Sequence, residues 1–114
     1  MARIPVRLAG PAQVTNAAAT KYTVPALTKT ILRHIQVQNP SGSAVTFTMS
    51  IGTDAAGTRI YDAFSIPAAA AGVTESVKSW WCYFVLATTE IVQALAGTNN
   101  ILTLTLDGDE IILG

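Results

Sequence analysis

The sequence predicts an all-β fold: a single antiparallel β-sandwich of jelly-roll or Greek-key type, with about eight strands and an extended N-terminal arm. Three observations lead to this prediction. Short segments alternate apolar and polar residues, which is the period of a half-buried strand. Gly, Pro, Asn and Asp separate these segments at regular intervals, as in sandwiches and barrels. No helical pattern alternates with the strands, which argues against an α/β fold.

The chain has 114 residues, which suits one domain. We divide it into an N-terminal arm or edge strand over residues 1–19 and a sandwich domain over residues 20–114. Ile4, Val6 and Leu8 alternate with polar neighbours, as in a strand. Pro5 cannot donate to a ladder, so the segment is expected at an edge. Gly10-Pro11 is expected to end it.

The longest regular segment, residues 28–39, is predicted as a strand because β-branched residues are frequent in it. The turn sequence at residues 39–42 is expected to lead into a second strand over residues 44–51, so that the two form a hairpin. Taking one face of each alternating segment as buried, we expect these core residues: Ile31, Ile35, Val37, Val45, Phe47, Met49, Ile51, Phe64, Leu102 and Leu104.

Further strands are predicted over residues 59–66, 80–86, 91–96 and 101–106. Asp107-Gly108 is expected to form a tight turn before a last short strand over residues 110–113. The segment from residue 80 has large side chains on both faces, so both faces are expected to be covered.

Composition suggests an assembly protein. Hydrophobic residues make up 50% of the chain and charged residues only 12%, against about 25% in a typical soluble domain. So little charge suggests that other subunits cover part of the surface. Seven basic and seven acidic residues cancel, and no basic stripe is present, so no nucleic-acid partner is expected. No apolar run reaches the ~18 residues of a membrane helix, and no signal peptide is apparent, so we expect synthesis in the cytoplasm and no membrane partner.

No catalytic, metal or cofactor site is predicted. Cys82 is the single cysteine, which excludes an intramolecular disulfide and a cysteine zinc cluster. His34 is the single histidine, and no motif supplies it with an orienting acid and a nucleophile. The carboxylates at residues 107–110 lack the spacing of an EF-hand and are explained by a turn. The protein is therefore not expected to be an enzyme.

Half of the aromatic residues lie within residues 80–84. Since side chains alternate along a strand, one set is expected in the core and the other against a partner or the second sheet. Stacking on a sugar ring is the alternative use of such a cluster. Arginines on the N-terminal arm are suited to bind a neighbour's carboxylates, the alternative being a solvated edge strand. The expected interface residues are Arg3, Ile4, Val6, Arg7, Trp81 and Tyr83.

The sequence from residue 21 onward resembles small virion proteins of tailed bacteriophages. The pieces that carry the resemblance are "YTVP" at residues 22–25, the strand and asparagine turn at residues 31–39, the threonine-rich strand at residues 45–52, "GTRIYDAFSIPA" and "VLATTEIVQALAGTNNILTLTLDG". The chain departs from the pattern at Leu27, where glycine is usual.

The resemblance implies a virion structural protein, and a capsid decoration or cement protein on the phage head is the leading hypothesis. Its expected partners are the major capsid protein or other virion proteins, and the symmetry of a shell suggests a homo-oligomer such as a trimer. A tail or fibre component, or a module that binds host glycans, are the alternatives. The resemblance transfers no catalytic residue and no cofactor.

Overall fold

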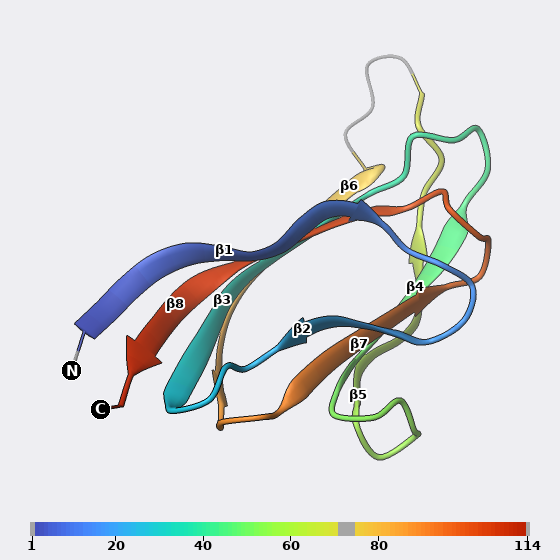
Figure 1. The fold of residues 1–114 in the computed structure, drawn as a ribbon. Helices are drawn as coiled ribbons and strands as arrows, with labels where there is room; N and C mark the ends of the chain where they lie inside the picture. The colour runs from blue at the N-terminus through green and yellow to red at the C-terminus, as the bar shows by residue number, and fades with distance from the viewer. Residues whose placement is uncertain (1, 71–74, 114) are drawn as a thin grey trace.

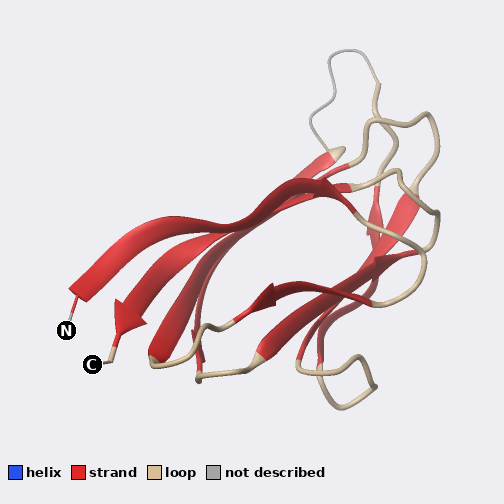
Figure 2. Cartoon of the chain, in the orientation of Figure 1, coloured by secondary structure: helices blue, strands red, loops and turns tan. Residues whose placement is uncertain are grey.

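The computed structural model describes residues 2–70 and 75–113, and in this part of the chain it contains strands and loops but no helix (Figure 2). The strands are β1 (Ala2–Gln13), β2 (Ala19–Thr23), β3 (Thr28–Gln38), β4 (Val45–Ile51), β5 (Arg59–Ile66), β6 (Val77–Leu86), β7 (Ile91–Ala96) and β8 (Thr103–Ile112). The all-β prediction is confirmed. Across these described residues, no helix that could cross a membrane is found.

The strands form two antiparallel sheets of four, which face each other in Figure 1. We call β1-β8-β3-β6 the first sheet and β2-β7-β4-β5 the second sheet. Successive strands lie in alternate sheets, except that β4 and β5 lie in the same one. The first strand pairs with the last, the second with the seventh, and so on inward: β1·β8, β2·β7, β3·β6 and β4·β5. This order is that of an eight-stranded jelly roll, so the predicted antiparallel sandwich is confirmed.

The hairpin expected between residues 28–39 and 44–51 is wrong, because β3 and β4 belong to different sheets. Asn39 redirects the chain between them. Its side chain is fully buried, and its amide donates to the carbonyl oxygens of Ser43 (2.8 Å) and Ile66 (3.0 Å). Its own oxygen accepts the backbone N–H of Ser41. These bonds stabilise a crossover, and the hairpin forms instead between β4 and β5.

The core lies between the sheets. The following expected core residues are buried in it: Ile35, Val37, Val45, Phe47, Met49, Leu102 and Leu104. Ile51 is partly buried and packs against the same cluster. Alternation along each strand accounts for these positions, since burying one face removes its apolar side chains from water.

Ile31 is buried but stands on the other face of the first sheet. In register it lies opposite Asp109 of β8 and Val85 of β6, and residues directly opposite share a face. The cause is a β-bulge between Leu32 and His34, which changes the parity of the strand. Leu32 therefore replaces Ile31 in the core between the sheets.

Phe64 is the second exception among the expected core residues. It pairs with Phe47, but β5 is the edge of the second sheet, and 41% of the Phe64 side chain remains exposed. Its ring meets the edge of the Trp80 ring at a centroid distance of 5.4 Å. Ala63, with φ of 49°, marks an irregularity in β5 directly before it.

Two expected chain breaks are absent from the structure. The strand β1 continues past Gly10-Pro11 to Gln13, and β8 runs through Asp107-Gly108 without a turn. Both glycines allow close backbone approach: a Cβ would lie 2.1 Å from the carbonyl oxygen of Leu104 at Gly10, and 2.1 Å from that of Ile31 at Gly108. Glycine therefore serves strand packing at both places.

Candidate interaction surface

The side chains of the first sheet that point away from the core form a surface that we call the outer face. It carries Arg3 and Arg7 of β1, Asp107 and Asp109 of β8, Arg33 and His34 of β3, and Trp81, Tyr83 and Val85 of β6. The last three, the β6 row, are exposed by 81%, 63% and 57%. Both faces of this strand were expected to be covered, but within the described chain nothing covers this one.

The six expected interface residues do not share one face. Arg3, Arg7, Trp81 and Tyr83 lie on the outer face, whereas Ile4 and Val6 point to the inner side of β1. Ile4 lies opposite Glu110, whose carboxylate accepts a hydrogen bond from the Tyr22 hydroxyl of the second sheet. Alternation along β1 separates these residues.

Arg3 is bound within its own chain. Its Nε and Nη2 donate to Oδ2 of Asp109 at 3.0 and 2.7 Å, and Nη1 of Arg33 donates to the same oxygen at 3.1 Å. These bonds, that of Arg3 first, hold the pKa of Asp109 below its usual range, and the pKa of Arg3 is raised in return. The carboxylate that Arg3 binds in this structure is therefore one of its own chain.

Strand pairing in the first sheet places a carboxylate and a hydroxyl beside His34, which the sequence alone did not predict. Oδ2 of Asp107 lies 3.5 Å from Nδ1 of His34, and Nε2 of His34 is hydrogen-bonded to Oγ of Ser79. The Trp81 ring stacks on the imidazole, with centroids 4.3 Å apart. The order acid, imidazole, hydroxyl is that of a hydrolytic triad. No local sequence signal predicts it, because the three residues come from three strands.

This group lies on an open surface in the described part of the chain. The described residues enclose no pocket, and the three side chains lie on the open surface of a sheet. Nucleophilic hydrolysis needs a shaped site with donors for the developing oxyanion. The arrangement instead fixes the orientation of His34 and, through stacking, that of Trp81.

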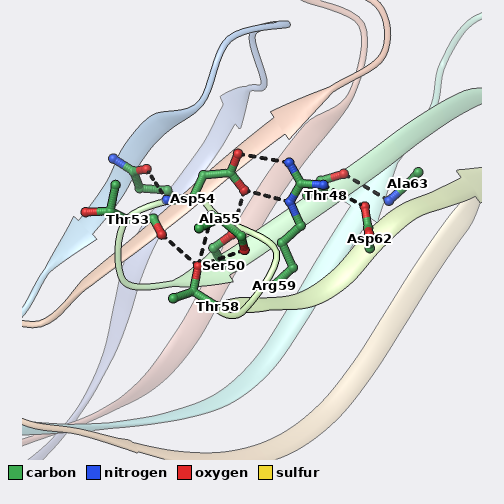
Figure 3. Close-up of polar contacts among 10 residues, drawn as sticks. Thr48, Ser50, Thr53, Asp54, Ala55, Thr58, Arg59, Asp62 and Ala63 are labelled. Atoms are coloured by element: carbon green, nitrogen blue, oxygen red, sulfur yellow. Dashed lines mark hydrogen bonds and ion pairs between the residues drawn. The ribbon is translucent and has the colours of Figure 1, made fainter.

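The loop between β4 and β5 folds over part of the outward side of the second sheet (Figure 3). Oγ of Ser50 donates to Asp54 at 2.9 Å, and Nε and Nη2 of Arg59 donate to the two oxygens of Asp54. These contacts, led by Arg59, lower the pKa of Asp54. Thr48 and Ser50, which alternate with the core residues of β4, are 4% and 1% exposed. At these two positions the chain itself therefore covers the outward side of the sheet.

The carboxylates at residues 107–110 diverge. Asp107 points to His34, Asp109 to the two arginines, and Glu110 to Tyr22 on the inner side. Nowhere in the described chain do three acidic, histidine or cysteine side chains converge as a metal ion requires.

No family model and no curated protein matches the chain. Among solved structures, that of infectious bursal disease virus, Gx strain, aligns with 99% of this chain and 32% of its own at 12% identity, with a TM-score of 0.47. The Gt strain aligns with 96% of this chain and 30% of its own at 10% identity, with a TM-score of 0.39. The chain thus spans about a third of those chains, and its function is argued below from its own residues.

Proposed function

We propose that the protein is a structural component of a virus particle, and specifically a bacteriophage head protein that decorates or cements the capsid shell. The observation that carries the proposal is the exposed β6 row on a chain with only 12% charged residues. Jelly rolls are frequent among capsid domains, and the resemblance of the sequence to small phage virion proteins agrees with this role.

The outer face suits a protein partner such as the major capsid protein. Trp81 and Tyr83 offer aromatic area of the kind that dominates interface energetics. Arg7 lies on the same face at the opposite edge of the sheet. Its side chain is exposed by 64%, with Nε 3.9 Å from Oδ1 of Asp107, and its guanidinium can bind a partner's carboxylate. A protein bound only to the assembled shell stabilises that shell by mass action. The role then requires occupation of a site and no chemical step.

The proposal is tested on purified particles by mass spectrometry of heads and by cryo-microscopy. We expect the protein on the outside of the shell in a copy number that follows shell symmetry. Recombinant protein with Trp81→Ala and Tyr83→Ala should lose binding to shells that lack the protein, whereas Leu27→Ala, also exposed but outside the outer face, should bind normally. Heads without the protein would contradict the proposal.

A tail or fibre component is the alternative within the same class, and copy number separates the two. Assembly on the tail predicts far fewer copies per particle than on the shell.

One observation favours a second candidate, a module that binds host glycans. The exposed Trp81 ring has the polar groups of His34, Ser79 and Asp107 beside it, and aromatic stacking with adjacent hydrogen-bonding groups suits a sugar ring. Binding on a glycan array that disappears in Trp81→Ala would support this candidate. An array without binding would exclude it for the glycans tested.

A further inference from the structure

The sandwich has four edge strands, and they differ in how they are protected. An edge strand exposes unpaired backbone groups, and proteins block such edges with proline, charge, bulges or shortness. The β1 edge contains Pro5, Pro11, Arg3 and Arg7, and its pairing with β8 shifts register twice. It is the most heavily protected of the four.

The two edges of the second sheet are also blocked. The strand β2 has only five residues, contains Lys21 and shifts register against β7. The strand β5 contains the Arg59–Asp62 ion pair, with N and O 3.0 Å apart, and shifts register twice against β4. Addition of a further strand is disfavoured at both edges.

The β6 edge is the least protected of the four. It is ten residues long, has no proline, Lys78 is its one charged residue, and its pairing with β3 shifts register once. In the described chain it pairs with β3 alone. Among the described residues, eight large apolar side chains are exposed. Four of them belong to β6 and a fifth is Phe64, packed against Trp80: Val77, Trp81, Tyr83, Val85 and Phe64. A long, weakly protected edge and exposed apolar side chains therefore coincide at one strand.

We infer that β6 pairs antiparallel with β6 of a second copy of this chain, so that two first sheets join into one. Antiparallel pairing of identical strands is a closed two-fold contact. A two-fold axis near Cys82 places the two Lys78 side chains at opposite ends of the pair, so like charges do not meet. Residues opposite each other share a face, so Trp81 of each copy meets Tyr83 of the other as an aromatic cross-strand pair, and Val85 lies opposite Ser79.

The pairing leaves the outer face open and makes it continuous across two copies. It does not rest on the proposed function, and it is two-fold where the symmetry of a shell suggested a trimer. A strand from a different protein would use the same backbone groups, but it would lack the symmetric placement of Lys78. Measurements on the isolated protein distinguish the two.

The test is light scattering of the purified chain during size-exclusion chromatography over a range of concentrations. We expect a species of twice the 12.0 kDa chain mass that dissociates on dilution. Tyr83→Lys brings two like charges to a diagonal cross-strand distance beside the two-fold axis, and Val85→Lys replaces an apolar side chain of the pair by a charge; each should weaken the dimer at least about tenfold. Ile4→Lys, at the opposite edge of the first sheet and 49% exposed, should leave it unchanged. Circular dichroism verifies that each variant is folded.

Hydrogen exchange separates edge pairing from stacking of two apolar faces. Pairing should slow the β6 amides that point away from β3 in the dimer relative to the diluted monomer. A chain that stays monomeric at high concentration overturns the inference, as does a dimer whose outward β6 amides exchange quickly. A dimer unaffected by both lysine variants also overturns it.

Discussion

Trp80 and Trp81 are consecutive in β6 and stack on opposite sides of the first sheet. Trp80 stacks on Tyr61 of the second sheet with centroids 4.4 Å apart, and Trp81 stacks on His34 of β3 at 4.3 Å. The first contact packs β6 against β5 at the side of the core. The second contact orients the exposed Trp81 ring on the outer face. Strand alternation gives the two neighbouring indoles these separate roles.

Removal of each tryptophan should therefore have a different effect. Trp80→Ala leaves a cavity beside Tyr61 and should lower the free energy of unfolding by about 3 kcal/mol. Trp81→Ala removes a ring that is 81% exposed and should change it by less than about 1 kcal/mol. Denaturant unfolding monitored by circular dichroism measures both. Equal losses would contradict the assignment of the two faces.

Gly108→Ala should be severely destabilising, by about 3 kcal/mol or more, because its Cβ would meet the backbone oxygen of Ile31 at 2.1 Å and the strands must separate. Gly57→Ala is the matched control, since nothing lies within 4 Å of a Cβ there. The midpoints of denaturant unfolding give the comparison. Similar midpoints for the two variants would show that β3 and β8 do not approach as described.

Leu27→Gly should stabilise the protein by about 1 kcal/mol. Leu27 has φ of 52° and is 69% exposed, so it bears the strain of the left-handed region without burying its side chain. Glycine has no Cβ and adopts a positive φ readily, so it removes the strain. Leu27→Ala keeps a Cβ and should show no such gain. The midpoints of thermal unfolding of the wild type, Leu27→Gly and Leu27→Ala measure this difference.

Alkaline pH should weaken the fold through Tyr22. Burial, and then its hydrogen bond to Glu110, raise the pKa of Tyr22 to about 12. Because the unfolded phenol titrates near pH 10, the stabilisation is complete below that pH and is lost as pH rises toward 12. Burial also raises the pKa of Tyr61, so titration by phenolate absorbance should show a late phase from both tyrosines, and Tyr22→Phe should remove its latest part. A late phase that is unchanged in Tyr22→Phe would contradict this.

Acid should weaken the fold through Asp54 and Asp109. Hydrogen bonds from Arg59 and Arg3, respectively, lower the pKa of each carboxyl in the folded state. Their stabilisation is therefore present above the unfolded value of about 4 and is lost as pH falls through the folded values. The midpoint of thermal unfolding should therefore decrease as the pH falls below about 4. The decrease should be smaller in the double variant Asp54→Asn/Asp109→Asn. Glu75→Gln, an exposed control, should keep the wild-type acid dependence.

Much of the fold follows from the order of residues along each strand. Alternation predicts that Phe47 and Met49 are buried and that Trp81 and Tyr83 point away from Trp80. It fails at Ile31, because a bulge between Leu32 and His34 depends on how β3 meets β8 and leaves no trace in the alternation itself. The tight turn expected at Asp107-Gly108 fails for a related reason: the glycine is required by the closeness of β3.

The candidate surface divides in the same way. The aromatic cluster and the shortage of charge are visible in the sequence, and they suggest a protein that binds other proteins. The group of Asp107, His34 and Ser79, and the pairing of Arg3 with Asp109, are not visible, because each unites strands far apart in the chain.

Local alternation thus determines that the chain forms strands and which side of most of them is apolar, since the direction of a side chain along a strand is set by its immediate neighbours. Pairing between distant strands determines the rest: which sheet each strand joins, where a bulge shifts the register, and which edge stays unblocked. The exposed edge at β6 is a property of that arrangement, because a strand is an edge only through the absence of a second neighbour.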